Sequence, residues 1–197
     1  MRAFVSLATL LLVTACGADS DDTATDPTAP MPTAIPAADG PVTGLGTVID
    51  HGGEPQFCLG PVAESYPPQC QGLPLAGWSW DEHRGEFENA SGVRFGSFAV
   101  TGTFDGTTLT AQDAVSGALY DPMPVPEPTS GAAEDHSQAE LDAIVEELNP
   151  LPGYLSGMTG DNLVAIDVVH DDGSLQAWVD ATYGTGLVFV RSALVSA

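Results

Sequence analysis

Two proline-containing segments limit how much of this chain of 197 residues can form a packed core. Residues 17–41 are mostly Asp, Thr, Ala and Pro, and they offer too little apolar surface to fold. Residues 121–131 carry proline at alternate positions, which favours a stiff polyproline II spacer. We therefore expect two small folded domains, over 42–116 and 136–197, joined by a linker over 117–135.

The first residues of the chain resemble the export signal of a bacterial lipoprotein. Residues 4–13 form an apolar run that is too short to cross a bilayer of about 30 Å as a helix. Residues 13–16, Val-Thr-Ala-Cys, are similar to a lipobox. The resemblance implies a signal peptide over 1–15 and acyl chains on Cys16, at the start of a disordered tether over 16–41. Because two or more acyl chains give stable anchoring, we expect a lipid-anchored protein on the extracytoplasmic face of the cell membrane. Simple secretion with an unmodified cysteine is the alternative.

Acidic residues outnumber basic residues by 27 to 4, which gives a formal net charge of −23 at pH 7, and the chain contains no lysine. Nucleic acids and anionic lipid head groups are bound through basic surfaces. We therefore expect no nucleic-acid partner, and a surface that attracts basic partners or substrates. A role in solvation, or a GC-rich genome that avoids lysine codons, explains the same charge without a function.

Cys58 and Cys70 form an even pair in a chain predicted to be exported, so we expect a disulfide between them. Closing a loop of this size contributes about 3 kcal/mol in the chain-entropy model. A metal site is the alternative, but no nearby cysteine or histidine pair completes a set of four ligands. We expect no metal or other cofactor.

The first domain contains short runs of strand-forming residues. The Asp105-Gly106 pair after Phe104 is a strong signal for a hairpin turn. Further expected strands are 44–49, 56–59 and 75–80. About five short strands predict a small antiparallel β-barrel or curled sheet, for which the OB type is one candidate.

The second domain is predicted to have an α+β fold, so that the whole chain belongs to the α+β class. Ser137 and Glu140 form a capping box that starts a helix, and Asn149-Pro150 ends it. Residues 171–183 fit either a helix that ends at Gly184 or a hairpin that turns at Asp172-Gly173, and we favour the helix. The expected strands are 154–158, 163–169 and 187–190.

Several segments in both domains are similar to those of one group of proteins. They are Cys58 to Cys70, Gly77-Trp78-Ser79-Trp80, Val100 to Gly106, and Tyr183 to Val188 followed by Ser192 to Leu194. With these segments the chain resembles uncharacterised secreted or lipid-anchored proteins of actinobacteria. The resemblance implies a cell-envelope location and a disulfide, but it implies no reaction and no catalytic residues.

Trp78 and Trp80 are the best candidates for a ligand-binding surface. Residues separated by one position share a face of a strand, so an exposed pair would form a flat platform for a sugar ring or a peptide. Burial of both rings in the core is the alternative and the more common case.

Acidic residues surround the isolated histidine His83, where a metal site or an acid–base pair is imaginable. They are Asp81, Glu82, Glu86 and Glu88. An exposed loop between strands is the favoured interpretation. Three further carboxylates, Asp167, Asp171 and Asp172, could bind calcium weakly, but helix capping and turn formation explain them without a metal. No serine lies in a Gly-x-Ser-x-Gly motif and no histidine pair has the spacing of a zinc site, so we assign no catalytic residues.

The sequence therefore predicts a non-enzymatic envelope lipoprotein that binds another envelope protein or a wall glycan. An envelope hydrolase that uses a pair of carboxylates and a calcium-stabilised adhesion module are the alternatives.

Overall fold

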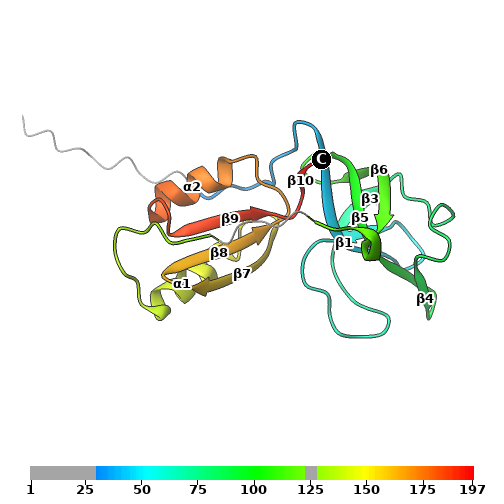
Figure 1. Cartoon of the computed structure of the whole chain (residues 1–197), viewed down its shortest axis with the longest axis horizontal. Helices are drawn as coiled ribbons and strands as arrows, with labels where there is room; N and C mark the ends of the chain where they lie inside the picture. The colour runs from blue at the N-terminus through cyan, green and yellow to red at the C-terminus, as the bar shows by residue number, and fades with distance from the viewer. Residues whose placement is uncertain (1–29, 123–127) are drawn as a thin grey trace, which may run out of the picture.

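The computed structural model describes residues 30–122 and 128–197 of the chain. The predicted signal peptide and Cys16 lie outside these residues. Within the described ranges the protein belongs to the α+β class, with a seven-stranded sheet, a three-stranded sheet and two α-helices (Figure 1). No helix in this part of the chain is both long enough and apolar enough to span a membrane.

The elements follow one another in an order that separates most strands of the large sheet from those of the small one. Before the linker they are β1 (Pro41–Asp50), β2 (Gln56–Cys58), β3 (Leu73–Ala76), β4 (Glu88–Ala90), β5 (Val93–Phe104), β6 (Leu109–Ser116) and a 3₁₀ turn, η1 (Gly117–Leu119). After it they are α1 (Gln138–Leu148), β7 (Tyr154–Gly160), β8 (Leu163–Val168), α2 (Ser174–Tyr183), β9 (Val188–Ser192) and β10 (Val195–Ser196).

The seven-stranded sheet is curled, as the sequence predicts. Its strand order is β10-β1-β2-β3-β6-β5-β4, and β1 also pairs with β5 over ten register positions. Residue 46 of β1 is a glycine, and a Cβ at this position would collide with the carbonyl oxygen of Cys58 in β2. The absence of a side chain therefore allows β1 to approach β2 closely. Most neighbours are antiparallel, but β3 runs parallel to β6 through the pairs Leu75–Leu109 and Ala76–Thr110.

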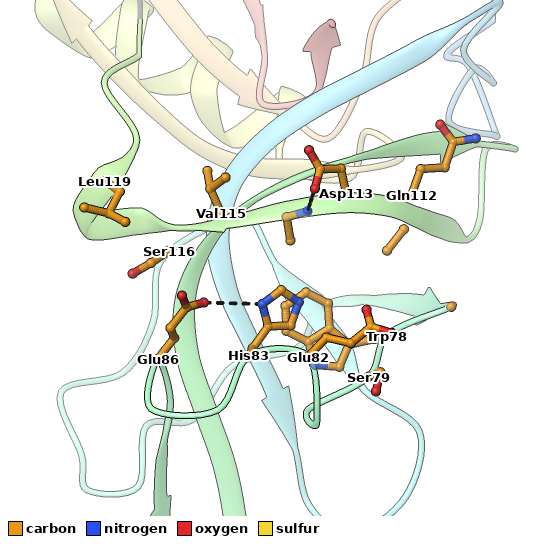
Figure 2. Close-up of a pocket in the computed structure, with 13 residues that line it drawn as sticks. Trp78, Ser79, Glu82, His83, Glu86, Gln112, Asp113, Val115, Ser116 and Leu119 are labelled. Carbon is orange, nitrogen blue, oxygen red and sulfur yellow. Dashed lines mark hydrogen bonds and ion pairs between the residues drawn. The ribbon is translucent and has the colours of Figure 1, made fainter.

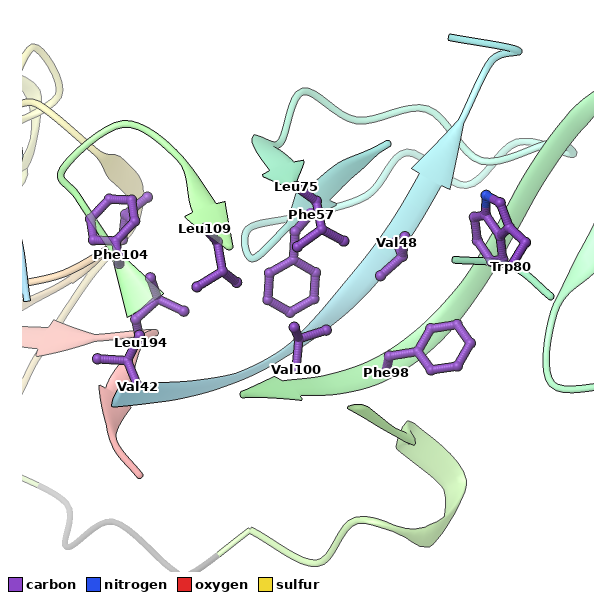
Figure 3. Packing of buried hydrophobic residues seen from close by; sticks show 11 residues of the cluster. Val42, Val48, Phe57, Leu75, Trp80, Phe98, Val100, Phe104, Leu109 and Leu194 are labelled. Carbon is purple, nitrogen blue, oxygen red and sulfur yellow. The ribbon is translucent and has the colours of Figure 1, made fainter. Parts of the chain in front are cut away.

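The core of this sheet lies inside the curl. Along β5, Phe98, Val100 and Phe104 occupy alternate positions and are buried, as the period of a strand requires. They meet apolar side chains from the other strands (Figure 3). These include Val42, Val48, Phe57, Leu75 and Leu109.

The three-stranded sheet has the order β7-β8-β9 and carries both helices. Val164, Ile166 and Val168 alternate along the central strand β8, and they join one apolar cluster with residues from α1 and α2. β8 and β9 are parallel, and α2 connects them. The predicted strands 154–158, 163–169 and 187–190 therefore correspond to β7, β8 and β9, with small differences at their ends.

Both predicted helices are present. The capping box of α1 is formed as expected: the Ser137 hydroxyl accepts the Glu140 N–H, and the Glu140 carboxylate accepts the Ser137 N–H. For residues 171–183 the helix is confirmed. The Asp171 carboxylate caps it from three residues before its first residue, accepting the N–H groups of Leu175 at 2.9 Å and Gln176 at 3.2 Å.

The expected strand over 75–80 is wrong in its second half. β3 ends at Ala76, because Gly77 turns the chain with a φ of 73° and passes close to the Ala111 carbonyl. Trp78 and Trp80 therefore lie in the irregular segment that follows the strand.

The last strand returns from the small sheet to the large one. β10 pairs with β1 through Val42–Ser196 and Thr43–Val195, a contact that the sequence did not predict. Two residues that flank the small sheet, Val169 and Leu194, are buried in the core of the large sheet. The two sheets therefore share part of one core.

Candidate functional site

A pocket of about 370 Å³ lies between β6 and the loop 77–86 that follows β3 (Figure 2). Residues 111–116 of β6 and Leu119 form one wall. The other wall is formed by loop residues, which are Gly77, Trp78, Ser79, Glu82, His83 and Glu86. We call this cavity the β6 pocket.

The loop is fixed by Trp80, whose side chain is buried behind it. The Trp80 Nε1–H donates to Asp50 Oδ2 at 3.1 Å, and Arg94 donates to the same oxygen at 2.6 Å. Asp50 also accepts the N–H groups of Gly52 and Gly53 through Oδ1, so this buried carboxylate is fully hydrogen-bonded. Because β1 supplies Asp50 and β5 supplies Arg94, two strands of the curled sheet hold the pocket wall in place.

Stacked rings form the base of the loop wall. The His83 ring lies parallel to the Trp78 ring, with centroids 4.4 Å apart and an interplanar angle of 15°. Both rings also contact Phe98 of the core. The Nε1–H of Trp78 is buried and has no hydrogen-bond acceptor among the described residues.

The polar groups of the β6 pocket are acidic. His83 Nδ1 lies 3.3 Å from Glu86 Oε2, and the side chains of Glu82 and Asp113 line the same cavity. No arginine is among its lining residues, and the chain has no lysine to supply. Beside these carboxylates stand two exposed apolar side chains, Val115 with 42% and Leu119 with 80% of their surface accessible.

The predicted tryptophan pair is arranged differently from a flat platform. The Trp78 and Trp80 rings meet edge to face, with centroids 5.3 Å apart and an interplanar angle of 82°, and Trp80 is only 6% exposed. Trp78 lines the β6 pocket and Trp80 does not. A role for Trp78 in ligand binding stays a prediction, and Trp80 contributes by positioning the loop.

The acidic residues around His83 separate into two groups. Glu82 and Glu86 line the β6 pocket with His83. Asp81 instead pairs with Arg84 at 2.9 Å, and Glu88 accepts the Tyr66 hydroxyl at 3.1 Å. The sequence analysis missed Asp113, Val115 and Leu119 as pocket residues, because the pairing that brings β6 near the loop gives no local signal.

The three aspartates considered for calcium make other contacts. Asp167 binds Arg191 through two hydrogen bonds of 2.9 and 3.1 Å, and Asp171 and Asp172 accept backbone N–H groups at the start of α2. Within the two described ranges, no group of three or more His, Cys, Asp or Glu side chains is placed to hold a metal ion.

The expected disulfide between Cys58 and Cys70 is present, with a Cα–Cα distance of 6.2 Å. It closes the segment between β2 and β3, within which Ala63 forms a bridge with Gln69. The disulfide therefore holds the connection that precedes β3, whereas the pocket loop follows β3.

In comparisons with known proteins, no family model, no curated protein and no solved structure gives a significant match to this chain. The site itself therefore carries the functional argument.

Proposed function

We propose that this protein is a non-enzymatic binding protein of the cell envelope, and that the β6 pocket is its ligand site. The pocket combines the features of a small binding site: a concave surface, an aromatic base and a few polar side chains. The observation that carries the proposal is the position of Leu119, an 80% exposed apolar residue on the wall of an acidic cavity. Binding would bury apolar surface that the free protein leaves in water.

A lipid anchor at Cys16 is part of this proposal. It is supported by the similarity of residues 13–16 to a lipobox and by the Asp-, Thr-, Ala- and Pro-rich composition of the residues that follow. The predicted tether over 16–41 is too long at its end, because Met31, Ile35 and Ala38 pack against the apolar clusters of the two sheets. The anchor is tested by expressing the full chain and Cys16→Ser in a bacterial host and separating each by detergent phase partitioning. The native chain should enter the detergent phase and the variant should not. Partitioning of the variant into detergent would contradict the anchor.

We further propose that the curled sheet is a small barrel of the OB type. The cycle of pairings β1-β2-β3-β6-β5-β1 and the parallel β3–β6 pair support this assignment. The division into domains over 42–116 and 136–197 belongs to the same proposal, supported by the two apolar clusters, each of which draws most of its residues from one sheet. β10 would then be a strand that the second domain contributes to the first.

The binding site is tested by substitution of Leu119, whose exposed side chain can change without loss of packing. Leu119→Asp adds a charge to the pocket wall, and Met158→Asp, at a 55% exposed residue on β7, is the matched control. The native chain and both variants would be immobilised and exposed to fractionated envelope proteins and wall glycans. A component retained by the native chain and by Met158→Asp, but lost with Leu119→Asp, supports the proposal. Equal retention by all three would refute it.

A hydrolase is the second candidate, favoured by the contact between His83 and Glu86. A carboxylate that orients an imidazole within a pocket is a common acid–base arrangement. If Glu86→Gln abolished hydrolysis of a wall glycan or envelope peptide by the purified chain, this candidate would replace the binding protein.

A further inference from the structure

We propose that the β6 pocket binds a basic peptide segment in extended conformation, which adds to the free edge of β6 as an additional strand. This inference rests on the proposed function, because it names the class of ligand that the same site takes. It follows from three independent observations: an unpaired strand edge, the course of the cavity along that edge, and the charge of its walls.

The edge of β6 is free over most of its length. On one side β6 pairs with β5 from Leu109 to Ser116. On the other side, within the described residues, the register with β3 includes Leu109 and Thr110 alone, because the chain turns away at Gly77. Beyond the close approach of Gly77 to Ala111, the backbone groups of residues 112–116 that point away from β5 therefore have no strand partner among the described residues. Unpaired edges of this kind are templates for strand addition.

The cavity follows this edge. Six consecutive residues of β6, 111–116, line it, and at the rise of a strand they extend over about 20 Å. A compact small molecule would contact a short part of such a wall. Figure 2 shows Trp78 and His83 of the loop on one side of the cavity and β6 on the other. An added strand would lie between them.

The walls complement a basic peptide. Glu82 and Glu86 stand on the loop side and Asp113 on the strand side, and no arginine or lysine lines the cavity. In an added strand, alternate side chains point to opposite faces. Asp113 and Val115 are two residues apart on β6 and share one face. One set would therefore meet this face with its carboxylate and apolar surface, and the other set would meet Glu82 and Glu86 of the loop.

The protein protects one group of this edge itself. The Ala114 N–H donates to the Asp113 carboxylate at 2.9 Å. This N–H group is therefore satisfied by a side chain and not by the backbone of β5. A side chain that satisfies an edge donor reduces indiscriminate pairing between sheets. A peptide with a basic residue can draw the Asp113 carboxylate to itself and accept the Ala114 N–H in its place, so that pairing is selective for basic segments.

The test uses a defined probe, an acetylated and amidated hexapeptide of alternating valine and arginine, with the full chain and isothermal titration calorimetry. Two related peptides separate the contributions: one with glutamate in place of arginine, and one with arginine and N-methyl groups on alternate amides. We expect the arginine peptide to bind and the glutamate peptide not to bind. The N-methylated peptide should bind at least about tenfold more weakly, since it cannot complete a strand ladder.

Two variants locate the peptide on the edge. Ala114→Pro removes the edge N–H, and proline is tolerated where a strand N–H does not join the ladder. Ala114→Val keeps the N–H and serves as the control, and thermal unfolding of both variants reports whether the fold is retained. Weaker binding of the arginine peptide by Ala114→Pro, with binding retained by Ala114→Val, supports strand addition.

The failures of the two proposals differ. If the N-methylated and arginine peptides bind equally while Leu119→Asp abolishes retention of an envelope component, the pocket is a ligand site but strand addition is wrong. If no peptide binds while Leu119→Asp still abolishes retention of an envelope component, the proposed function stands and the peptide class is wrong. If the arginine peptide binds equally to the native chain and to folded Ala114→Pro, it binds elsewhere and this inference is refuted. Asp113→Asn keeps a hydrogen-bond acceptor and removes the charge. It should therefore weaken binding of the arginine peptide less than Ala114→Pro does.

Discussion

The Nε1–H of Trp80 donates to Oδ2 of Asp50 across 3.1 Å, in a place where both side chains are almost completely buried. The bond connects β1 to the loop that forms one wall of the β6 pocket. Trp78, two residues before Trp80, has a buried Nε1–H with no acceptor among the described residues. The two indoles therefore offer a matched pair of substitutions.

Trp80→Phe should reduce the free energy of unfolding by about 1–3 kcal/mol, because a buried carboxylate loses one of its hydrogen-bond donors. Trp78→Phe should cost less, since its N–H makes no bond that the substitution could break. Urea denaturation followed by circular dichroism measures both. Equal losses in the two variants would show that ring size, and not the bond to Asp50, decides stability.

The pKa of Asp50 predicts how the fold responds to acid. Burial raises this pKa, but hydrogen bonds from Gly52, Trp80, Arg94 and Gly53 outweigh it, so that the pKa lies below the ordinary value of 3.8. The stabilisation is therefore complete above pH 3.8 and is lost as the pH falls through the lowered pKa. The stability difference between the native chain and Asp50→Asn should shrink over this range. A difference that stayed constant with pH would contradict the assignment.

Tyr183 predicts the response to alkali. Burial, with the nearby Glu147 carboxylate at 3.2 Å from its hydroxyl, raises the pKa of Tyr183 from 10.0 to about 12. The neutral phenol is favoured in the fold, so its contribution is complete below pH 10 and is lost as the pH rises through about 12. Tyr183→Phe should remove this part of the alkaline loss of stability. Ultraviolet titration should also lack one late-ionising phenol in the variant.

The disulfide predicts a defined loss of stability. Replacing Cys58 and Cys70 together with alanine should lower the free energy of unfolding by about 3 kcal/mol, the value for a loop closed by residues 12 apart. Denaturation in guanidinium chloride measures the change. Reducing agent should weaken the native chain by a similar amount and leave the double variant unaffected. A response of the double variant to the reducing agent would contradict this account.

Elements encoded by neighbouring residues could be predicted from the sequence. Ser137 and Glu140 form the capping box within one helical turn, and Asp105 accepts the N–H groups of Thr107 and Thr108 in the turn between β5 and β6. Each of these signals requires only a few consecutive residues, so no knowledge of the rest of the fold is needed.

Features that join distant segments could not be predicted in this way. The strand expected to continue through Trp80 stops because Gly77 passes close to Ala111, which lies 34 positions later in the chain. The pocket was foreseen only in part: His83 and Glu86 are near each other in sequence, whereas Asp113 and Leu119 reach the same cavity through the parallel pairing of β3 with β6. Composition indicates that acidic residues are abundant but not which of them converge.

The pairing of β10 with β1 places residue 197 next to the start of β1. The N–H of Ala197 donates to the carbonyl of Pro41 at 3.0 Å. Because Ile35 and Ala38, which precede this pairing, pack against the core of the large sheet, the segments before β1 and after β9 are both held by the same sheet. By the same geometry, a reporter protein fused after Ala197 would emerge beside residue 41, on the side from which the preceding segment leaves.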